Sequence, residues 1–142
     1  MSRSLRIEQV TALSDALAIR ADVFIRGQGV PANEEVDGLD GDCLHWVLSD
    51  EIGPVATLRV LTRDEETAKI QRVAVLDRAR GRGHGATLMR HVLEELTEMG
   101  FTRATLGSQV PAIGFYERLG FVAYGPIYDD AGIEHRDMDR IL

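Results

Sequence analysis

The sequence predicts a mixed α/β fold, in which helices flank a central sheet of six to seven mostly antiparallel strands. Short apolar strand patterns separated only by turn residues come early in the chain, which is typical of antiparallel hairpins. In the middle of the chain, an apolar strand, a glycine-rich turn and an amphipathic helix precede another apolar strand. Such a crossover makes the two strands parallel neighbours. A doubly wound nucleotide fold would instead alternate strand and helix throughout.

Length and composition favour a single domain spanning residues 1–142. A chain of 142 residues that is 44% hydrophobic can bury one core, and it shows no internal repeat. The sequence pI near 5.0 argues against a nucleic-acid partner, and the lack of an 18-residue apolar run argues against a membrane partner. Cys43 is the only cysteine and the first residues lack an apolar signal segment, so we expect a cytoplasmic protein.

The first half of the chain predicts five segments before the crossover. They are an edge strand at residues 5–10, a helix from residue 14 to about residue 25, a loop or short helical turns at residues 26–42, and strands at residues 44–49 and 55–61. Ser14 is expected to cap the helix with its hydroxyl. Gly53 and Pro54 form a tight turn, which makes the last two strands a hairpin.

Residues 69–96 organise the rest of the chain. β-Branched side chains at Ile70, Val73 and Val75 predict a strand. The helix after it is predicted by apolar residues at i, i+3, i+4 and i+7, which are Met89, Val92, Leu93 and Leu96.

Between this strand and this helix lies the sequence RGRGHG, residues 80–85. Glycine has no Cβ, so the backbone here can turn sharply and approach a ligand closely. The helix that follows offers unpaired N–H groups and the positive end of its dipole to an anion. The chain has a formal net charge of −7, yet residues 67–93 contain six cations and one acid. A local positive field in an acidic protein predicts a small polyanion such as a pyrophosphate.

The last third of the chain predicts three strands and a helix. The strands lie at residues 104–106, 121–124 and 134–138, the helix at residues 111–119, and a turn-rich connection at residues 126–132. Pro111 suits the start of this helix and Gly120 its end.

Residues 80–85 resemble the acetyl-CoA-binding motif of the GNAT superfamily of N-acetyltransferases, Arg/Gln-x-x-Gly-x-Gly/Ala, through Arg80, Gly83 and Gly85. Residues 109–123, QVPAIGFYERLGFVA, resemble the second signature of this family. The strand and the helix around the first motif stand in the expected order, and the resemblance covers residues 44–138. Residues 28–48, with their acidic pair and Asp-Gly-x-Asp turn, resemble the ElaA-like branch of the superfamily.

The resemblance implies a GNAT-like sheet whose parallel pair splays apart and receives acetyl-CoA as the acyl donor. The backbone near residues 81–86 would hold the pyrophosphate, and Val73 and Val75 would pair with the pantetheine arm as an added strand does. The implied cofactor-binding residues are Val73, Ala74, Val75, Arg80, Gly81, Arg82, Gly83, His84, Gly85, Ala86, Gln109, Ala112, Phe115 and Tyr116.

The implied activity is N-acetyl transfer to a primary amine by direct attack in a ternary complex. Tyr116 matches the family's tyrosine near the cofactor sulfur, and a phenol there can protonate the leaving thiolate. Backbone N–H groups of residues 73–75 can stabilise the developing oxyanion.

The sequence does not single out a general base. Some family members carry a glutamate on the strand before the glycine turn, where this chain has Lys69, Gln71 and Arg72. We expect Glu34 or Glu35, in the acidic segment, to bind or deprotonate the amine. Other candidates are Asp37, His45 and a chain of water molecules. An acidic segment suits a cationic small molecule or a lysine side chain as acceptor.

The sequence leaves one other function open and disfavours a second. A non-catalytic acyl-CoA-sensing module would use the same motifs without turnover. A dinucleotide-binding oxidoreductase is disfavoured, because Leu88 occupies the position of the third required glycine. No metal site is expected, because the four histidines show no ligand spacing. The resemblance leaves a homodimer open.

Overall fold

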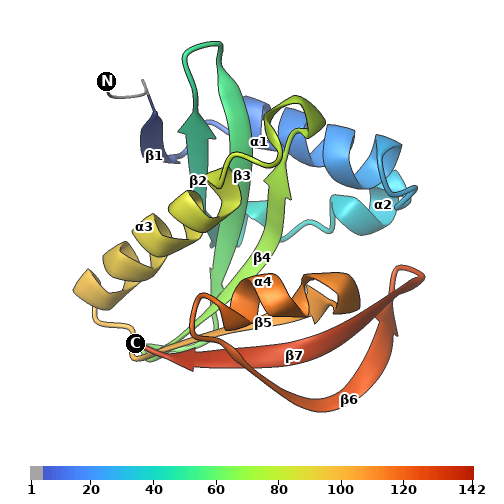
Figure 1. The fold of residues 1–142 in the computed structure, drawn as a ribbon. Helices are drawn as coiled ribbons and strands as arrows, with labels where there is room; N and C mark the ends of the chain where they lie inside the picture. Colours follow the sequence, from blue (N-terminus) through green and yellow to red (C-terminus); the bar gives the residue numbers. More distant parts are fainter. Residues whose placement is uncertain (1–4) are drawn as a thin grey trace.

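The computed structural model describes residues 5–142, which build one seven-stranded sheet with the order β1-β2-β3-β4-β5-β7-β6 (Figure 1). The strands are β1 Arg6–Val10, β2 Cys43–Ser49, β3 Pro54–Thr62, β4 Thr67–Val75, β5 Arg103–Gln109, β6 Val122–Asp130 and β7 Ile133–Ile141. The helices are α1 Ser14–Arg20, α2 Ala32–Glu35, α3 His84–Glu98 and α4 Ile113–Glu117. The mixed, mostly antiparallel architecture predicted from the sequence is confirmed.

The core lies where α3 packs on the central strands. β2 and β3 are buried on both faces, and Trp46 and Leu58 are almost completely inaccessible. Leu88, Val92 and Leu96 of α3 fill the same cluster. α1 covers the opposite face, so that β3 and β4 lie between helices (Figure 1). Burial from both sides makes this part of the sheet a rigid base for the loops at its ends.

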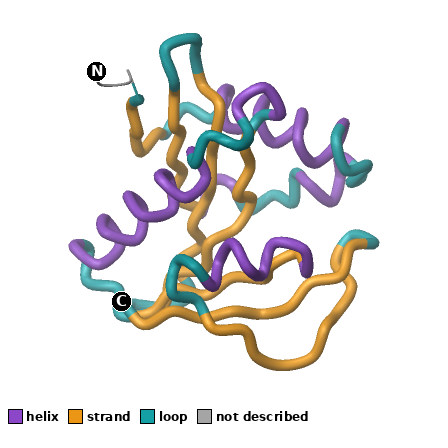
Figure 2. The backbone as a smooth tube through the Cα atoms, in the orientation of Figure 1, coloured by secondary structure: helices purple, strands orange, loops and turns teal. Residues whose placement is uncertain are grey.

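The parallel pair β4–β5 opens the sheet. Hydrogen-bonded register joins Thr67–Lys69 to Arg103–Thr105 and then stops, although both strands continue. Figure 2 shows the two strands diverging beyond this point. A bulge in β4 adds to the divergence, because two residues of β4 face Leu58 and Arg72 takes the left-handed conformation with φ 57°. Beyond Lys69 the β5-facing edge of β4 is therefore unpaired.

The first helix differs from the prediction at its start. Ser14 is not the cap, because the carbonyl of Leu13 already accepts a hydrogen bond from the N–H of Leu17, at 2.8 Å. No side chain caps this end. The helix continues as a π-helical segment from Ala21 to Arg26, close to its predicted end. Residues 26–42 contain the predicted short helical turns, which are α2 and a 3₁₀ turn at residues 40–42.

The connection predicted at residues 126–132 is mostly strand. β6 continues to Asp130, and only Ala131 and Gly132, with φ 54° and 79°, make the turn into β7. A register break between Tyr124 and Tyr128 absorbs Gly125 and Pro126. β6 is an edge strand, so the N–H that Pro126 lacks costs no ladder hydrogen bond.

Candidate active site

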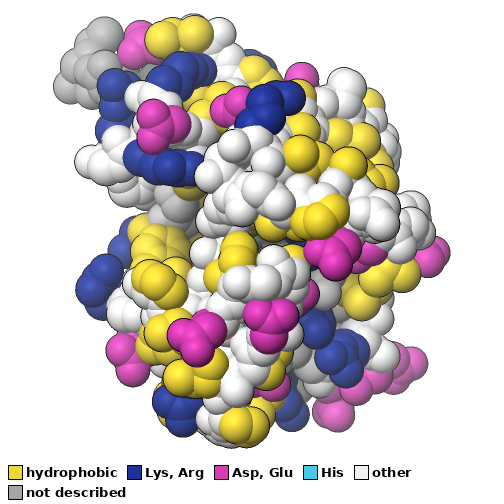
Figure 3. Space-filling view, turned by 90° about the vertical axis from the view of Figure 1, so that its right-hand side faces the viewer, with side chains coloured by type: hydrophobic (Ala, Val, Ile, Leu, Met, Phe, Trp, Pro, Cys, Tyr) yellow, Lys and Arg dark blue, Asp and Glu magenta, His cyan; other side chains and the backbone are white. Residues whose placement is uncertain are grey.

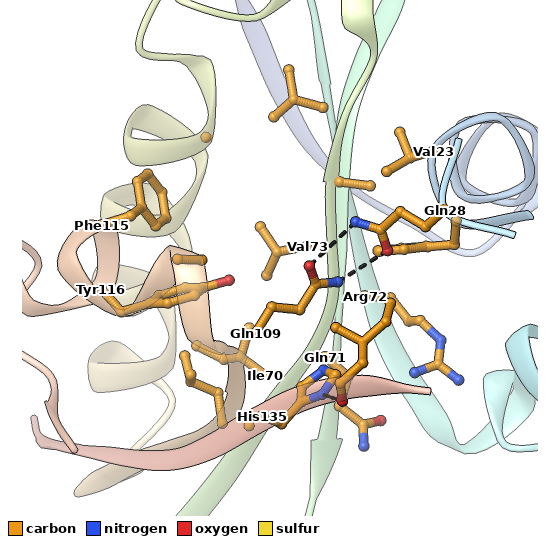
Figure 4. A pocket seen from close by; sticks show the side chains of 18 of the residues that line it. Val23, Gln28, Ile70, Gln71, Arg72, Val73, Gln109, Phe115, Tyr116 and His135 are labelled. Carbon is orange, nitrogen blue, oxygen red and sulfur yellow. Dashed lines mark hydrogen bonds between the residues drawn. The ribbon is translucent and has the colours of Figure 1, made fainter. Parts of the chain in front are cut away.

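A cleft of about 690 Å³ opens where β4 and β5 diverge. Its walls come from the last turns of the first helix, α2, β4, the turn before α3, α4 and the β6–β7 hairpin (Figure 4). The residues for which a cofactor or catalytic role is predicted line this cleft, with the exception of Arg82 and of the further base candidates Asp37 and His45. The structure thus brings together residues from positions 34 to 116 of the sequence.

The turn before α3 presents backbone donors to the cleft. Gly83 takes the left-handed conformation, with φ 77°, and its carbonyl accepts the first helical hydrogen bond from Thr87 at 3.0 Å. In the described part of the chain, the N–H groups of residues 84–86 have no acceptor. A Cβ added at Gly85 would already touch Phe115 Cζ at 3.4 Å and Val75 at 3.6 Å, so a larger side chain would press on both. Together with the helix dipole, these donors form an anion site.

The positive charge predicted around this turn is partly neutralised. Arg80 donates through Nε to the carbonyl of Val75 at 3.1 Å, and its guanidinium lies 3.4 Å from Asp77. Arg78 pairs with Asp50 at 3.1 Å. No ion pair of Arg82 is found among residues 5–142, and its side chain is exposed. Two of the arginines near this turn are thus already paired, so the open backbone N–H groups are the main donors that it offers to an anion.

Tyr116 lies between Phe115 and Phe121, with ring centroids 4.9 and 6.0 Å away. Its hydroxyl points into the cleft (Figure 4), and within the described residues no side chain or backbone group hydrogen-bonds to it. Burial raises the pKa of the Tyr116 phenol above its ordinary value. The phenol therefore stays protonated and is available as a donor.

Gln109, at the end of β5, is paired across the cleft. Its Nε2 donates to Gln28 Oε1 at 3.0 Å, and Gln28 Nε2 donates back to Gln109 Oε1 at 3.3 Å (Figure 4). Gln28 follows the first helix, so this pair joins the two sides of the splayed sheet. The amide nitrogen of Gln109 carries two hydrogens, so its second N–H stays open to a cofactor while this contact is kept.

The acidic segment of residues 34–42 faces inward, toward three arginines. Arg20 and Arg59 are almost completely buried, and Arg72 is 23% exposed. We call these arginines together with Glu35, Asp37 and Asp40 the arginine–carboxylate network. Its ion pairs are Arg20–Glu35 at 3.1 Å, Arg20–Asp40 at 2.6 Å, Arg59–Asp37 at 2.6 Å, Arg59–Asp40 at 2.9 Å, Arg72–Glu35 at 2.7 Å and Arg72–Asp37 at 3.4 Å.

These contacts hold the carboxylates in their charged form. Hydrogen bonds from Arg59 lower the pKa of Asp37 far below its ordinary range. Burial alone would raise the pKa of Asp40, but hydrogen bonds from Arg20 and Arg59 outweigh it, and this pKa is also lowered. Three carboxylates and three guanidiniums cancel, so the segment is not the acidic face that its composition predicts.

The two glutamates predicted to handle the amine therefore differ. Glu35 is 2% exposed and forms ion pairs with both Arg20 and Arg72. Glu34 is exposed at the rim of the cleft, and no ion pair of its side chain is found within residues 5–142. Figure 3, which views the side of α2 and the β6–β7 hairpin, shows charges of both signs interspersed.

Neither a membrane span nor a metal cluster is found in the described part of the chain. No helix among residues 5–142 is both long and apolar enough to cross a bilayer. Within the same residues, no group of three or more His, Cys, Asp or Glu side chains is arranged to hold a metal ion.

The splayed parallel pair, the donor-lined turn and the tyrosine in one cleft match a known family. The model of the Acetyltransferase (GNAT) family matches residues 16–121. The chain belongs to the GNAT acetyltransferase family. Its sequence is 34% identical over 127 residues to the uncharacterized N-acetyltransferase YjcF of Bacillus subtilis, covering 89% of this chain and 90% of YjcF.

Two relatives with solved structures resemble this GNAT chain in both sequence and fold. It is 35% identical to protein ElaA of Escherichia coli over 144 residues, covering 96% of this chain and 90% of ElaA. The ElaA crystal structure superposes with a TM-score of 0.83 and covers 98% of this chain and 99% of ElaA. An acyl-CoA N-acyltransferase from Pseudomonas aeruginosa is 33% identical, with a TM-score of 0.84 and coverage of 98% and 99%. The predicted family and its ElaA-like resemblance are confirmed.

Proposed function

We propose that this GNAT protein transfers an acetyl group from acetyl-CoA to a primary amine by direct attack in a ternary complex. The observation that carries the proposal is the continuity of one cleft. It leads from the unpaired N–H groups of residues 84–86 along the free edge of β4 to the hydroxyl of Tyr116.

The cofactor would bind mainly through backbone groups. The pyrophosphate would accept hydrogen bonds from the turn at residues 81–86, in the field of the α3 dipole. The pantetheine arm would run along residues 73–75, where β4 has lost its partner β5. Ala112 and Phe115 of the second motif line the cleft beside this path. Gln109 would donate its second amide N–H to the arm, because its bond to Gln28 uses only one.

The chemical step needs a donor for the leaving sulfur and a donor for the oxyanion. Tyr116 offers a protonated hydroxyl without a protein partner, which suits a general acid for the thiolate. Backbone N–H groups of residues 73–75 would stabilise the negative charge that develops on the thioester oxygen.

The acceptor would enter from the side of α2 and the β6–β7 hairpin. Glu34 and Asp130 line this end of the cleft, and both are exposed. Glu34 would attract the ammonium group of a small molecule or a lysine side chain. Glu35 would act indirectly, because its two ion pairs fix α2 and the left-handed residue Arg72.

The test compares cofactor binding with turnover in Tyr116→Phe. Acetyl-CoA is titrated by calorimetry, and thiol release is followed with spermidine, kanamycin and a single-lysine peptide as acceptors. We expect unchanged affinity for acetyl-CoA and a rate lowered by about 10²–10⁴-fold. Tyr124→Phe is the matched control, because Tyr124 is exposed on β6 outside the cleft.

Two outcomes would contradict the proposal. Wild-type protein that binds acetyl-CoA but releases no thiol with any amine would favour the acyl-CoA-sensing module. Wild-type protein that does not bind acetyl-CoA would show that the turn before α3 serves another anion.

A further inference from the structure

We infer that His135 of β7 accepts the proton that the amine loses before it attacks, which rests on the proposed acetyl transfer. No glutamate stands on β4 for this task, and Glu35 is held by Arg20 and Arg72. His135 lines the same cleft as Tyr116 but comes from the β6–β7 hairpin, on the acceptor side (Figure 4).

The hydrogen bond of the His135 ring selects its tautomer. Nδ1 lies 2.8 Å from the backbone carbonyl of Ile133. A carbonyl oxygen only accepts, so Nδ1 must carry the hydrogen. In the neutral ring the lone pair then lies on Nε2, which has no hydrogen-bond partner among residues 5–142. This is the arrangement of an imidazole that is ready to take up a proton.

Packing fixes the orientation of this ring. Tyr128 stacks on His135, with ring centroids 6.0 Å apart and planes inclined by 24°. The Tyr128 hydroxyl donates to Asp137 at 2.7 Å, and the ring packs directly over Gly107. The Tyr128 ring is therefore held by its hydroxyl, and its face supports the His135 ring in the stacked orientation.

The sheet register places His135 beside the reaction path. His135 lies opposite Gln109 in the β5–β7 pairing and opposite Tyr128 in the β6–β7 pairing, so the three side chains share one face of the sheet. Gln109 occupies the position that the family resemblance assigns to the cofactor arm. An amine that approaches the thioester from the hairpin side would pass His135.

Charged groups of both signs face this region. The ones that line the cleft are Lys69 and Arg72 from β4, Arg80 from the turn before α3, Glu34 and Glu35 from α2, and Asp130 from β6, while Asp137 of β7 contacts the Tyr128 hydroxyl. Glu35 and Arg72 are paired with each other, and Asp137 accepts the Tyr128 hydroxyl. Glu34 and Asp130 remain to attract the ammonium, and Nε2 of His135 is the open proton acceptor in the same cleft.

The reaction takes two protons from the amine nitrogen, one to His135 and one to Tyr116. The ammonium gives one proton to Nε2 of His135, and the nitrogen lone pair forms the N–C bond to the thioester carbon. The C–S bond breaks, and the thiolate takes the proton of Tyr116. The second nitrogen proton restores the Tyr116 phenol, and the imidazolium releases its proton to solvent. One amide, one thiol and one released proton result from one ammonium and one thioester.

The experiment uses His135→Asn in the full chain. The asparagine amide can still donate to the Ile133 carbonyl, but it has no group at the position of Nε2. With an alkylamine such as spermidine near neutral pH, we expect kcat/KM to fall by about 10²-fold or more, while acetyl-CoA affinity by calorimetry is unchanged. For wild type we expect kcat/KM to level off as pH rises, whereas for His135→Asn it should rise about tenfold per pH unit with the free-amine fraction.

A second acceptor, which needs no deprotonation, distinguishes proton transfer by His135 from a structural role of this residue. Trifluoroethylamine is already neutral at the assay pH, so His135→Asn should lower its kcat/KM by less than about tenfold. His91 is a half-buried histidine of α3 that lies outside the cleft and pairs with Glu95, so His91→Asn is the matched control and should match wild type.

Equal losses with both amines, or an unchanged pH profile, would overturn the role of His135 while leaving acetyl transfer intact. Wild-type protein without turnover for any amine would overturn acetyl transfer and this role together.

Discussion

The turn before α3 and the acidic segment of residues 34–42 form two sides of one cleft, but they are built by different means. The turn works through its backbone, with the left-handed Gly83 and the open N–H groups of residues 84–86. The acidic segment works through side chains, whose carboxylates meet three arginines from α1, β3 and β4. One region keeps its polar groups free for a ligand, and the other uses most of them internally.

Ligand-binding capacity in this protein resides more in the turn before α3 than in the acidic segment. Unpaired N–H groups at a helix start cannot be satisfied by the helix itself, so they remain available to an anion. Buried carboxylates must be paired, because an isolated charge in the interior is very costly. Composition alone therefore overstates how acidic the acceptor side is, since Glu35, Asp37 and Asp40 are already neutralised.

Removal of a central arginine should have the largest effect. Arg59 is fully buried and contacts Asp37, Asp40 and Gln71. Arg59→Ala removes the main partner of Asp37 and one of the two arginine partners of Asp40. We expect the free energy of unfolding to fall by about 3–5 kcal/mol, measured by urea denaturation.

The matched control for this change is Arg26→Ala. Arg26 forms an exposed i,i+4 pair with Asp22, and its removal should cost less than about 0.5 kcal/mol. Equal losses in Arg59→Ala and Arg26→Ala would mean that the arginine–carboxylate network is no more than a set of surface pairs.

A substitution in the turn before α3 should lower acetyl-CoA affinity more than it lowers the stability of the fold. At Gly85→Val the new side chain would press on Phe115 and Val75 and cover neighbouring N–H groups. Loss of hydrogen bonds to a charged phosphate costs about 1.5–3 kcal/mol, so acetyl-CoA affinity should fall by about 10- to 100-fold in calorimetry.

A glycine of the acidic segment provides the control. Gly41 has open space around its Cβ position, and Gly41→Val should leave the affinity for acetyl-CoA unchanged. If Gly85→Val bound acetyl-CoA as tightly as Gly41→Val, the backbone of the turn could not be the phosphate site.

Most of the fold could be predicted because its signals are local. Alternating and β-branched stretches marked the strands, and the strand–turn–helix–strand order predicted the parallel pair. The prediction failed at β6, where Gly125 and Pro126 normally indicate a loop. A bulge on an exposed edge strand accommodates both residues, and only the tertiary position of β6 reveals this.

The acidic half of the site could not be predicted for a related reason. The partners of Glu35 and Asp37 lie 15 and 22 residues away, on elements that only the fold brings together. Arginine is rarely buried, so no pattern in the sequence marked Arg20 or Arg59 as interior. The tautomer of His135 follows from a local contact with Ile133 of the same strand, but the stacking of Tyr128 on its ring likewise becomes visible only once β6 and β7 are paired.

Removal of the Arg82 charge should have the smallest effect, and it tests whether side-chain charge adds to the acetyl-CoA affinity of the backbone site. Arg82 is exposed, lines no part of the cleft and has no ion pair within residues 5–142. Arg82→Ala should therefore lower acetyl-CoA affinity by no more than about fivefold at low salt, as expected for an exposed charge. The loss should disappear at about 0.5 M salt, because ions screen exposed charges but not the steric block in Gly85→Val.

Arg63→Ala controls for the overall change in charge. Arg63 is exposed beyond the start of β4, at the opposite end of this nine-residue strand, about 30 Å from the turn and well past the Debye length at 0.1 M salt. It should leave the affinity unchanged at every salt concentration. A loss in Arg82→Ala that exceeds the loss in Gly85→Val, or that persists at high salt, would mean that the arginine side chain contacts the phosphate directly. The turn would then resemble the acidic segment, with side chains rather than backbone carrying its function.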